Sequence, residues 1–330
     1  DFFAVYRQHN PGFDAYVGIT MFETDRLPAG WAAACNGMDE IWVPSTFNKE
    51  TFARAGVDPE RLEVVPFGLD IRAFDPSSVA PLTIPERKGF VFLSTFQWTK
   101  RKGWDVLLRA YLSAFTPADD VCLVLRTYPD RLKTPPIRER VDHCVRELGH
   151  DPKRIPPIIL LEDFIPEDQM PSLYAAADAF VLPTRGEGWG IPYMEAMSMS
   201  LPVIATRWGA HLDFMDDQNS YLIDIDGLRP VDSEQTAENP YYTSDQHWAE
   251  PSVSHAAALL RHVFENREEA QAKGARARRD IQRDWSIDRT AEWIAERAAH
   301  LLAVKPAARR SEPRLLPAPV QTGSLPGKAG

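Results

Sequence analysis

The chain has 330 residues, of which 44% are hydrophobic and 25% are charged, a composition typical of a soluble globular protein with one or two domains. No apolar run approaches the ~20 residues that a membrane-spanning helix needs. The net charge of -10 repels a phosphate backbone, so nucleic acid is not expected as a partner. Cys35, Cys122 and Cys144 form no C-x-x-C pair, which argues against a disulfide framework or a structural zinc site and favours a reducing, cytoplasmic compartment.

The first part of the chain carries few predicted elements. Residues 47–55 predict an amphipathic helix and residues 62–65 a strand, and further apolar runs surround Val17 and Trp42. Because this block is too short for a full domain, we expect residues 1–76 to form an incomplete amino-terminal domain. The turn-rich residues 77–88 are the expected linker.

From residue 89 onward, β-rich apolar runs alternate with segments of helical period, the pattern of βαβ units around a parallel sheet. The expected strands are residues 90–95, 121–126, 158–161, 179–182, 202–205 and 221–224. The expected helices are residues 104–115, 137–148, 168–177, 191–200 and 210–215. This order predicts a doubly wound α/β domain over residues 89–285, which binds ligands beyond the carboxyl ends of its strands.

The carboxy-terminal part is predicted as a polar loop to about residue 250, followed by helices over residues 254–268 and 286–302. The last helix has one apolar stripe with three- and four-residue spacing. Its members are Ile287, Ala291, Ile294, Ala298 and Leu301. We expect residues 286–303 to pack back on the first domain, and residues 304–330, which are basic and rich in Pro, Gly and Ala, to be a disordered tail.

The most informative stretch runs from residue 183 to 197, where a strand ends, glycines follow, and Pro192 marks the first turn of a helix. A helix amino terminus at this edge of a sheet offers free N–H groups and a positive dipole end to a ligand. Glu187 in the loop and Glu195 in the helix can each accept from a pair of sugar hydroxyls. Alternatively, the glycines serve only the turn and Glu195 only the helix dipole.

A second candidate is the basic run Lys100-Arg101-Lys102, which follows a strand and leads into a helix. In a strand-to-helix loop of an acidic protein, consecutive cations supply charge-assisted donors for a diphosphate. The alternative is a solvated basic loop.

These motifs together resemble glycosyltransferase family 4. The resemblance rests on the E-x7-E stretch from Glu187 to Glu195, on the basic loop before Trp104, and on residues 64–70. Residues 21–26, 42–45, 163–164 and 241–251 resemble one branch of that family, so the likeness covers roughly residues 17–303.

The resemblance implies a GT-B architecture of two Rossmann-like domains facing each other across a cleft, here with an incomplete first domain and a doubly wound second one. It implies a retaining, metal-independent hexosyltransferase that moves a sugar from a nucleotide-diphosphate sugar to a glycan or lipid-linked acceptor, as in polysaccharide biosynthesis. It implies no cofactor besides this donor substrate, and it leaves peripheral contact with a membrane open.

The resemblance also implies roles for single residues. Glu187 would accept from the donor sugar, and Arg101 and Lys102 would hold the diphosphate during catalysis. The residues implied to bind the nucleotide and sugar are Glu195, Gly188, Trp189, Gly190, Ile191, Thr184, Asp163 and Phe164. No D-x-D pair is placed to hold a metal, so cations and the helix dipole would stabilise the leaving charge. Front-face departure is preferred to a covalent intermediate, because Glu187 is assigned to sugar hydroxyls.

The sequence departs from the family pattern in three respects. Gln97 stands where the commoner pattern has Arg, so Arg101 is expected to replace that donor. The first domain is shorter than in the family, so the chain is expected either to be a fragment or to have lost that half. His9 does not match the cleft histidine of some members and is expected at the surface, while His211 is expected to be structural.

Two alternative functions remain open. One is a non-transferring GT-B enzyme such as a sugar-nucleotide epimerase, which the E-x7-E stretch and the basic loop disfavour. The other is a module that binds a nucleotide-sugar without transferring it. The motifs do not determine the donor base (UDP, GDP or ADP), the acceptor or the oligomeric state.

Overall fold

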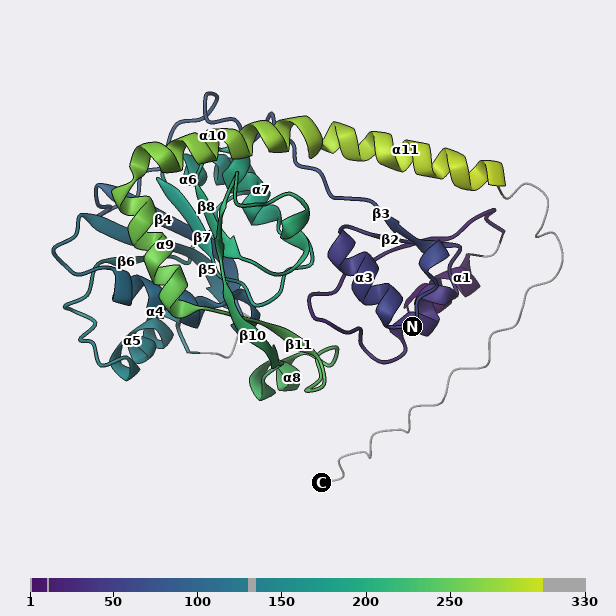
Figure 1. The fold of residues 1–330 in the computed structure, drawn as a ribbon, viewed down its shortest axis with the longest axis horizontal. Helices are drawn as coiled ribbons and strands as arrows, with labels where there is room; N and C mark the ends of the chain where they lie inside the picture. The colour runs from purple at the N-terminus through teal and green to yellow at the C-terminus, as the bar shows by residue number, and fades with distance from the viewer. Residues whose placement is uncertain (1, 11, 130–134, 305–330) are drawn as a thin grey trace, which may run out of the picture.

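The computed structural model describes residues 2–10, 12–129 and 135–304, which form two α/β lobes (Figure 1). The smaller lobe contains a parallel sheet in the order β1-β2-β3. Its elements are α1 (Phe2–His9), β1 (Val17–Ile19), α2 (Trp31–Asn36), β2 (Glu40–Val43), α3 (Thr46–Arg54) and β3 (Leu62–Val64). The predicted helix over residues 47–55 and strand over residues 62–65 are confirmed as α3 and β3.

Helix α3 begins where the sequence favours a helix start. The side chain of Ser45 accepts a hydrogen bond from the Asn48 backbone N–H and so caps the helix. The helix buries Phe52 in a small core with Ile41 and Leu62 from the neighbouring strands. This core fixes the carboxyl ends of β2 and β3 toward the larger lobe.

The larger lobe is built on a six-stranded parallel sheet in the order β6-β5-β4-β7-β8-β9. Its strands are β4 (Phe90–Trp98), β5 (Val121–Pro129), β6 (Ile158–Leu161), β7 (Ala179–Leu182), β8 (Val203–Thr206) and β9 (Tyr221–Ile223). All six predicted strands are confirmed. β4 and β5 each run three residues past their predicted ends, because alternating buried side chains such as Phe96 and Trp98 continue the strand pattern.

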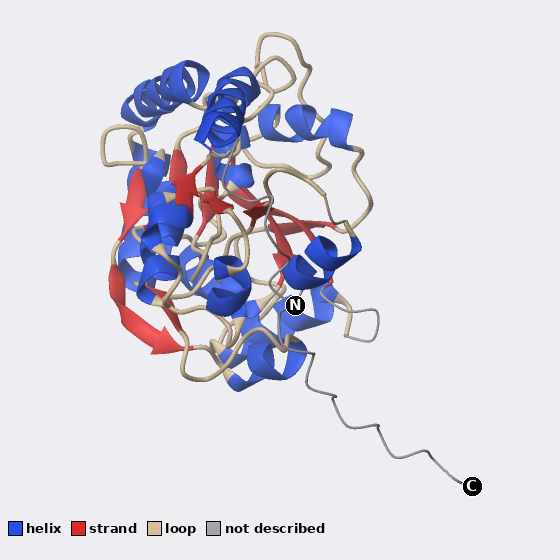
Figure 2. Ribbon diagram, turned by 90° about the vertical axis from the view of Figure 1, so that its right-hand side faces the viewer, coloured by secondary structure: helices blue, strands red, loops and turns tan. Residues whose placement is uncertain are grey.

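Helices pack around this sheet (Figure 2). They include α4 (Trp104–Ala114), α5 (Ile137–Glu147), α6 (Met170–Ala175) and α7 (Ile191–Ser198). α4 packs against α9 (Val253–Glu265), and α7 packs against α10 (Arg267–Asp284). Strands β7 and β8 are buried along their whole length, as expected for a parallel sheet covered on both faces.

Two predictions for the carboxy-terminal half are wrong, and a third, the helix over residues 254–268, is confirmed with an earlier end and a further helix behind it. The polar loop to residue 250 contains an antiparallel pair, β10 (Ile225–Pro230) and β11 (His247–Pro251), with helix α8 (Ser233–Glu238) between them. Residues 210–213 form a short 3-10 helix rather than an α-helix over 210–215. The helix predicted over residues 254–268 ends at Glu265, and the separate helix α10 buries only a narrow row at Ala270, Gly274, Ala277 and Ile281.

The last helix, α11 (Ile287–Val304), lies over the smaller lobe (Figure 1). The Thr290 hydroxyl donates to Pro66 O at 3.0 Å, and Leu301 packs with Trp42 and Val65. The predicted apolar stripe is buried only in part, because its member Leu301 is 6% exposed whereas Ile287 and Ile294 are 47% and 39% exposed. The tail predicted for residues 304–330 lies outside the described residues except for Val304, the last residue of α11.

The pair β10–β11 connects the two lobes. Although these strands follow the large sheet in sequence, Tyr242 and Trp248 pack in the core of the smaller lobe with Phe22. Asp25 and His247 exchange hydrogen bonds, with the His247 backbone N–H donating to Asp25 Oδ1 at 2.6 Å. The lobes are therefore joined on the side opposite α11 as well.

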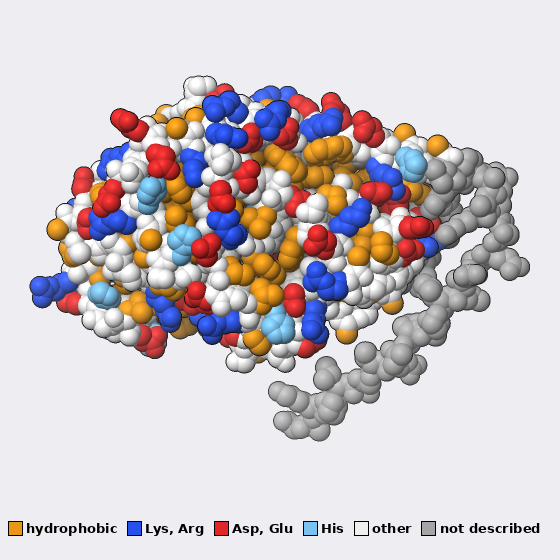
Figure 3. Space-filling view, in the orientation of Figure 1, with side chains coloured by type: hydrophobic (Ala, Val, Ile, Leu, Met, Phe, Trp, Pro, Cys, Tyr) orange, Lys and Arg blue, Asp and Glu red, His pale blue; other side chains and the backbone are white. Residues whose placement is uncertain are grey.

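The surface and the thiols agree with the composition. Basic and acidic side chains are interspersed over the face drawn in Figure 3. Cys35, Cys122 and Cys144 are free and buried, and burial raises the pKa of each thiol above its usual value. Within the described residues, no helix is both long enough and apolar enough to cross a bilayer.

Candidate active site

Most of the predicted site residues gather at the carboxyl ends of β4 and β7. Parallel strands bring these ends to one edge of the sheet, and a cavity of about 350 Å³ lies there. Its lining residues are Thr95, Phe96, Gln97, Arg101, Lys102, Arg126, Tyr128, Met170, Pro192 and Glu195. The cavity therefore joins the basic loop to the second carboxylate of the E-x7-E stretch.

The basic loop is held tightly against the end of β7. Lys100–Lys102 form a single 3-10 turn that ends at Gly103, whose φ of 68° is in the left-handed region. A Cβ added at Gly103 would lie 1.9 Å from Pro183 O. The Arg185 backbone N–H donates to Arg101 O at 2.7 Å, so the loops after β4 and β7 are positioned as one unit.

Within this unit, the first carboxylate meets both cations. Lys102 Nζ donates to Glu187 Oε2 at 2.6 Å, and Arg101 Nη1 lies 3.8 Å from Glu187 Oε1. Burial raises the pKa of Glu187, but the charges of Lys102 and Arg101 lower it more, so the carboxylate is ionised. Burial lowers the pKa of Lys102 below its usual value despite the attraction of Glu187.

Arg101 is engaged with the protein on several sides. Its Nη1 donates to Gly186 O at 2.7 Å, and its Nη2 lies 3.5 Å from Glu23 Oε1 in the smaller lobe. Burial alone would lower the pKa of Arg101, whereas the charges of Glu23 and Glu187 raise it above its usual value. Arg101 is therefore a fixed cation that links the two lobes.

The smaller lobe covers the glycine-rich loop. Glu187 is only 8% exposed. A Cβ added at Gly186 would lie 2.3 Å from Glu23 O, and one added at Gly188 would lie 2.7 Å from Met21 Sδ. Glycine at position 186 is thus required by the close approach of the Glu23 backbone, whereas the flexible Met21 side chain could move away from a Cβ at position 188.

The second carboxylate, Glu195, is held by a tyrosine. Tyr174 Oη donates to Glu195 Oε2 at 2.6 Å, and the same Oη lies 3.2 Å from Thr95 Oγ1. Burial raises the pKa of Glu195 to about 7, although the Tyr174 hydrogen bond and the charge of Arg126 lower it. At neutral pH this carboxyl can therefore serve as an acceptor or as a donor.

Other predicted residues build the frame of the site. Thr184 is fully buried, with its hydroxyl 2.8 Å from Gly186 O and 3.1 Å from Arg101 O. Trp189 is 2% exposed and packs against Phe214 and Trp285. The side chains of Thr184 and Trp189 therefore support the glycine-rich loop rather than face the cavity.

The start of helix α7 also agrees with the motif. Gly190 precedes it with a φ of 108°, where a Cβ would lie 2.7 Å from the Tyr193 ring. Ile191 is partly buried in the first turn. The backbone of this turn faces the site, next to Pro192 and Glu195 of the cavity lining.

Asp163 and Phe164 are not brought into the cavity. Both lie in the exposed segment after β6, and Phe164 is 84% exposed. The histidine expectations are consistent with the structure: His9 is exposed, and His211 is fully buried with Nε2 2.6 Å from Thr206 O. Burial lowers the pKa of His211, so it is neutral.

Sequence reasoning missed two sets of residues. Gln97, Arg126, Tyr128 and Met170 line the cavity, but none of them was assigned to the site. Gln97 and Tyr128 lie past the predicted strand ends, and Arg126 and Met170 lie in predicted elements that carry no motif there. Arg185, inside the glycine-rich stretch, forms a buried network that supports the basic loop. Its guanidinium donates to Asp105 at 2.8 and 3.0 Å and to Glu250 at 2.9 and 3.0 Å.

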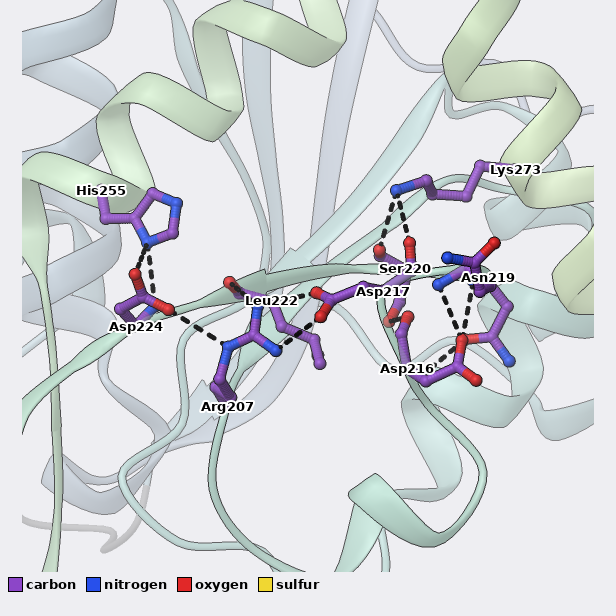
Figure 4. A network of polar contacts seen from close by, with 10 residues as sticks. Arg207, Asp216, Asp217, Asn219, Ser220, Leu222, Asp224, His255 and Lys273 are labelled. Atoms are coloured by element: carbon purple, nitrogen blue, oxygen red, sulfur yellow. Dashed lines mark hydrogen bonds and ion pairs between the residues drawn. The ribbon is translucent and has the colours of Figure 1, made fainter.

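A second polar network lies beyond β8 and β9, outside the cavity lining (Figure 4). Arg207 pairs with Asp217 at 2.7 Å and with Asp224 at 3.1 Å, and the Asp224 backbone N–H donates to His255 Nδ1 at 3.0 Å. Lys273 donates to Ser220 O at 3.2 Å. Because its charged members are largely exposed, this network ties down loops at the rim rather than forming a reaction centre.

Comparison with known proteins agrees with this geometry. The family model described as glycosyl transferases group 1 matches residues 87–238, which contain Arg101, Lys102, Glu187 and Glu195. The GDP-mannose-dependent alpha-(1-6)-phosphatidylinositol monomannoside mannosyltransferase of Mycobacterium tuberculosis is 27% identical over 274 residues, which cover 79% of this chain and 62% of that protein. A D-inositol 3-phosphate glycosyltransferase of Salinispora tropica is 31% identical over 198 residues, which cover 54% of this chain and 38% of that protein. The chain thus spans less than two thirds of the length of these relatives.

Solved structures share the fold. Anabaena HepE in complex with UDP and glucose superposes with a TM-score of 0.63 at 16% identity, covering 82% of this chain and 66% of that one. Sucrose-phosphate synthase from Thermosynechococcus elongatus gives a TM-score of 0.63 at 18% identity, and the match covers 83% of this chain and 61% of that one. Residues 87–238 are therefore similar to the group 1 glycosyltransferases, and the chain has the GT-B fold of these solved structures.

Proposed function

We propose that this protein transfers a sugar from a nucleotide-diphosphate sugar to an acceptor hydroxyl, with retention of anomeric configuration and without a metal ion. The observation that carries the proposal is the convergence of Lys102, Arg101, Glu187 and Glu195 on one edge of the sheet, three of them lining one cavity. Two cations and two carboxylates in this order suit a diphosphate flanked by two polyols, which are the sugar and the ribose.

The roles of the cations follow from their contacts. Lys102 can turn from Glu187 to the diphosphate, while Arg101 remains fixed by Gly186 and Glu23. The first turn of α7 adds backbone N–H donors to the same side. These groups stabilise the negative charge that develops as the diphosphate leaves, which is the task of a metal ion in other transferases.

Retention is assigned to front-face departure. Glu187 is already ion-paired through both carboxylate oxygens, so it is a poor nucleophile and a suitable acceptor for sugar hydroxyls. The bond from the anomeric carbon to the diphosphate oxygen breaks, and the acceptor oxygen bonds to that carbon from the same face. The acceptor proton passes to the departing phosphate oxygen.

The names of the relatives suggest where to look for substrates. Those in Mycobacterium tuberculosis and Salinispora tropica are named for phosphatidylinositol mannoside and inositol phosphate chemistry, and the HepE structure holds UDP and glucose. A glycan or lipid-linked acceptor in the cytoplasm, with peripheral membrane contact, is consistent with those names.

The first experiment is calorimetric titration of the chain with UDP, GDP and ADP, followed by assay of donor hydrolysis and transfer with the sugar nucleotide of the best binder. Binding with transfer supports the proposal, and analysis of the released sugar separates transfer from epimerisation. Tight binding without turnover would identify a nucleotide-sugar-binding module instead. If none of the three nucleotides binds, the assignment of this cavity is wrong.

A further inference from the structure

One wall of the cavity is formed by the end of β5, which carries Arg126 and Tyr128. Residues two apart in a strand point to the same face, and both side chains line the cavity, while Thr127 between them is buried on the other face. The Arg126 guanidinium lies over the Tyr128 ring, 5.2 Å from its centroid. This stacking orients a planar cation at the cavity wall.

The position of this wall relative to the cations decides which part of a nucleotide it meets. Lys102 follows β4, and its partner Glu187 follows β7, so the phosphate and sugar positions lie between these adjacent strands. β5 is the neighbour of β4 on the opposite side from β7. A nucleotide with its phosphates at Lys102 therefore extends its nucleoside toward β5.

Neighbouring side chains complete this wall. In the register of β4 and β5, Thr95 lies beside Arg126 and Gln97 beside Tyr128, and both β4 residues also line the cavity. Across the cavity, the charge of Arg126 acts on Glu195. No carboxylate of the described residues lies within ion-pair distance of Arg126, in contrast to Arg101, so its donors are available to a ligand.

The chemistry of a guanidinium discriminates between bases. Its parallel N–H donors match the adjacent O6 and N7 acceptors of guanine. Uracil offers only single carbonyl acceptors. Adenine carries an amino group beside N7, and this donor cannot bond to the N–H donors of the guanidinium.

We propose that Arg126 is a specificity-determining residue that reads the donor base, that it favours guanine, and that Tyr128 holds its guanidinium in plane. The inference rests on the proposed function, since it needs the nucleotide to occupy this cavity.

The test measures dissociation constants of GDP, IDP and ADP for the full chain and for Arg126→Met and Arg126→Lys. The wild type should bind GDP and IDP more tightly than ADP, because IDP keeps O6 and N7 and lacks only the 2-amino group. Each variant should lose roughly 10- to 100-fold in affinity for GDP and IDP and less than about twofold for ADP. Arg126→Lys should not restore the affinity for GDP and IDP, because lysine keeps the positive charge but not the two parallel donors.

Arg109→Met, at an exposed position on α4, is the matched control and should leave all three affinities unchanged. If the Arg126 variants lose equal affinity for GDP and ADP, Arg126 contacts the ribose or the phosphate, and the proposal that it recognises the base is wrong. Tighter binding of ADP than GDP by the wild type would also overturn it. Absence of binding for every nucleotide would instead contradict the proposed function, and circular dichroism of each variant excludes loss of folding.

Discussion

Glu195 is the residue whose contacts most directly test the nucleotide position. Its carboxylate is fixed by the Tyr174 hydroxyl at 2.6 Å and lines the cavity. We expect Glu195→Ala to weaken nucleoside diphosphate binding by about 1–3 kcal/mol at pH 8, because a charged acceptor for the ribose is lost. Calorimetry with the best-binding nucleotide measures this. Glu147→Ala, on the exposed side of α5, is the control, and unchanged affinity in a folded Glu195 variant would contradict the assignment.

The raised pKa of Glu195 has a second, independent consequence for stability. The folded-state pKa of about 7 exceeds the usual glutamate pKa of 4.5, so the native protein holds this proton more tightly than the unfolded chain. The corresponding stability is present below pH 4.5 and is lost as pH rises through 7. Glu195→Gln should therefore be more stable than the wild type at pH 8, by roughly 1–3 kcal/mol, and similar at pH 4.5. Urea unfolding at both pH values checks this, and a pH-independent difference would refute it.

Lys102 separates phosphate binding from nucleoside binding. Its Nζ donates to Glu187 at 2.6 Å beside the cavity. We expect Lys102→Ala to reduce the affinity for a nucleoside diphosphate by about 2–3 kcal/mol, because a charge-assisted bond is lost, while the nucleoside loses little. Calorimetric titration with both ligands makes the comparison. Equal losses for the two ligands would remove the diphosphate role.

At the scale of elements, Gly103 sets the position of the basic turn. A Cβ there would lie 1.9 Å from Pro183 O and would add the strain of a φ of 68°. Gly149 is the matched control, since its φ is 81° but no atom lies within 4 Å of an added Cβ. Gly149→Ala should cost about 1–2 kcal/mol from backbone strain alone. Gly103→Ala should cost clearly more and also weaken nucleotide binding, as measured by thermal unfolding and calorimetry. Equal effects of the two changes would show that the turn is not fixed by β7.

The sequence predicted those elements that have a strong period or buried length. The six parallel strands and helix α3 are apolar enough to be found without tertiary information. The strands β10 and β11 were missed because β10 is largely exposed and carries no alternation of apolar residues. Helix α10 was missed because its buried row contains Ala270, Gly274 and Ala277, which are too small to raise the apolar signal.

For the site, sequence reasoning identified the residues in loops with a motif and missed those at strand ends. Lys102 and Glu187 were assigned by the resemblance, and the structure brings them within 2.6 Å. Arg126 and Tyr128 belong to no motif, and only the length of β5 brings them to the cavity. Helix α11 shows the same limit, because Ile287 and Ile294 of the predicted buried stripe are exposed. Of the residues that contact the smaller lobe, Leu301 belongs to the stripe, whereas Thr290 and Arg297 do not.

At the scale of the whole molecule, α11 fastens the smaller lobe through a buried ion pair. Arg297 Nε donates to Glu40 Oε2 at 2.9 Å, and Glu40 is 4% exposed. Arg297→Met should lower the free energy of unfolding by about 1–3 kcal/mol, because among the described residues the Trp42 indole alone would remain as a side-chain donor to Glu40. Arg289→Met is the control, since Arg289 pairs with Glu292 on the exposed surface of the same helix. Denaturant unfolding measures the stability of both variants. If the two substitutions lower the free energy of unfolding equally, the Arg297–Glu40 pair does not hold α11 to the smaller lobe.

Met21 and Glu23 of the smaller lobe cover the glycine-rich loop, and this affects the order in which the donor enters and the nucleotide leaves. The nucleoside end of the cavity carries Tyr128, which is 45% exposed, whereas Glu187, the partner of the cavity residue Lys102, is 8% exposed. We expect entry of an intact donor to need release of the Glu23 contact to Arg101, which joins the two lobes. A spent nucleotide, which has already lost its sugar, does not need that release. We therefore expect uptake of the donor to be gated by lobe opening and departure of the nucleotide to be ungated.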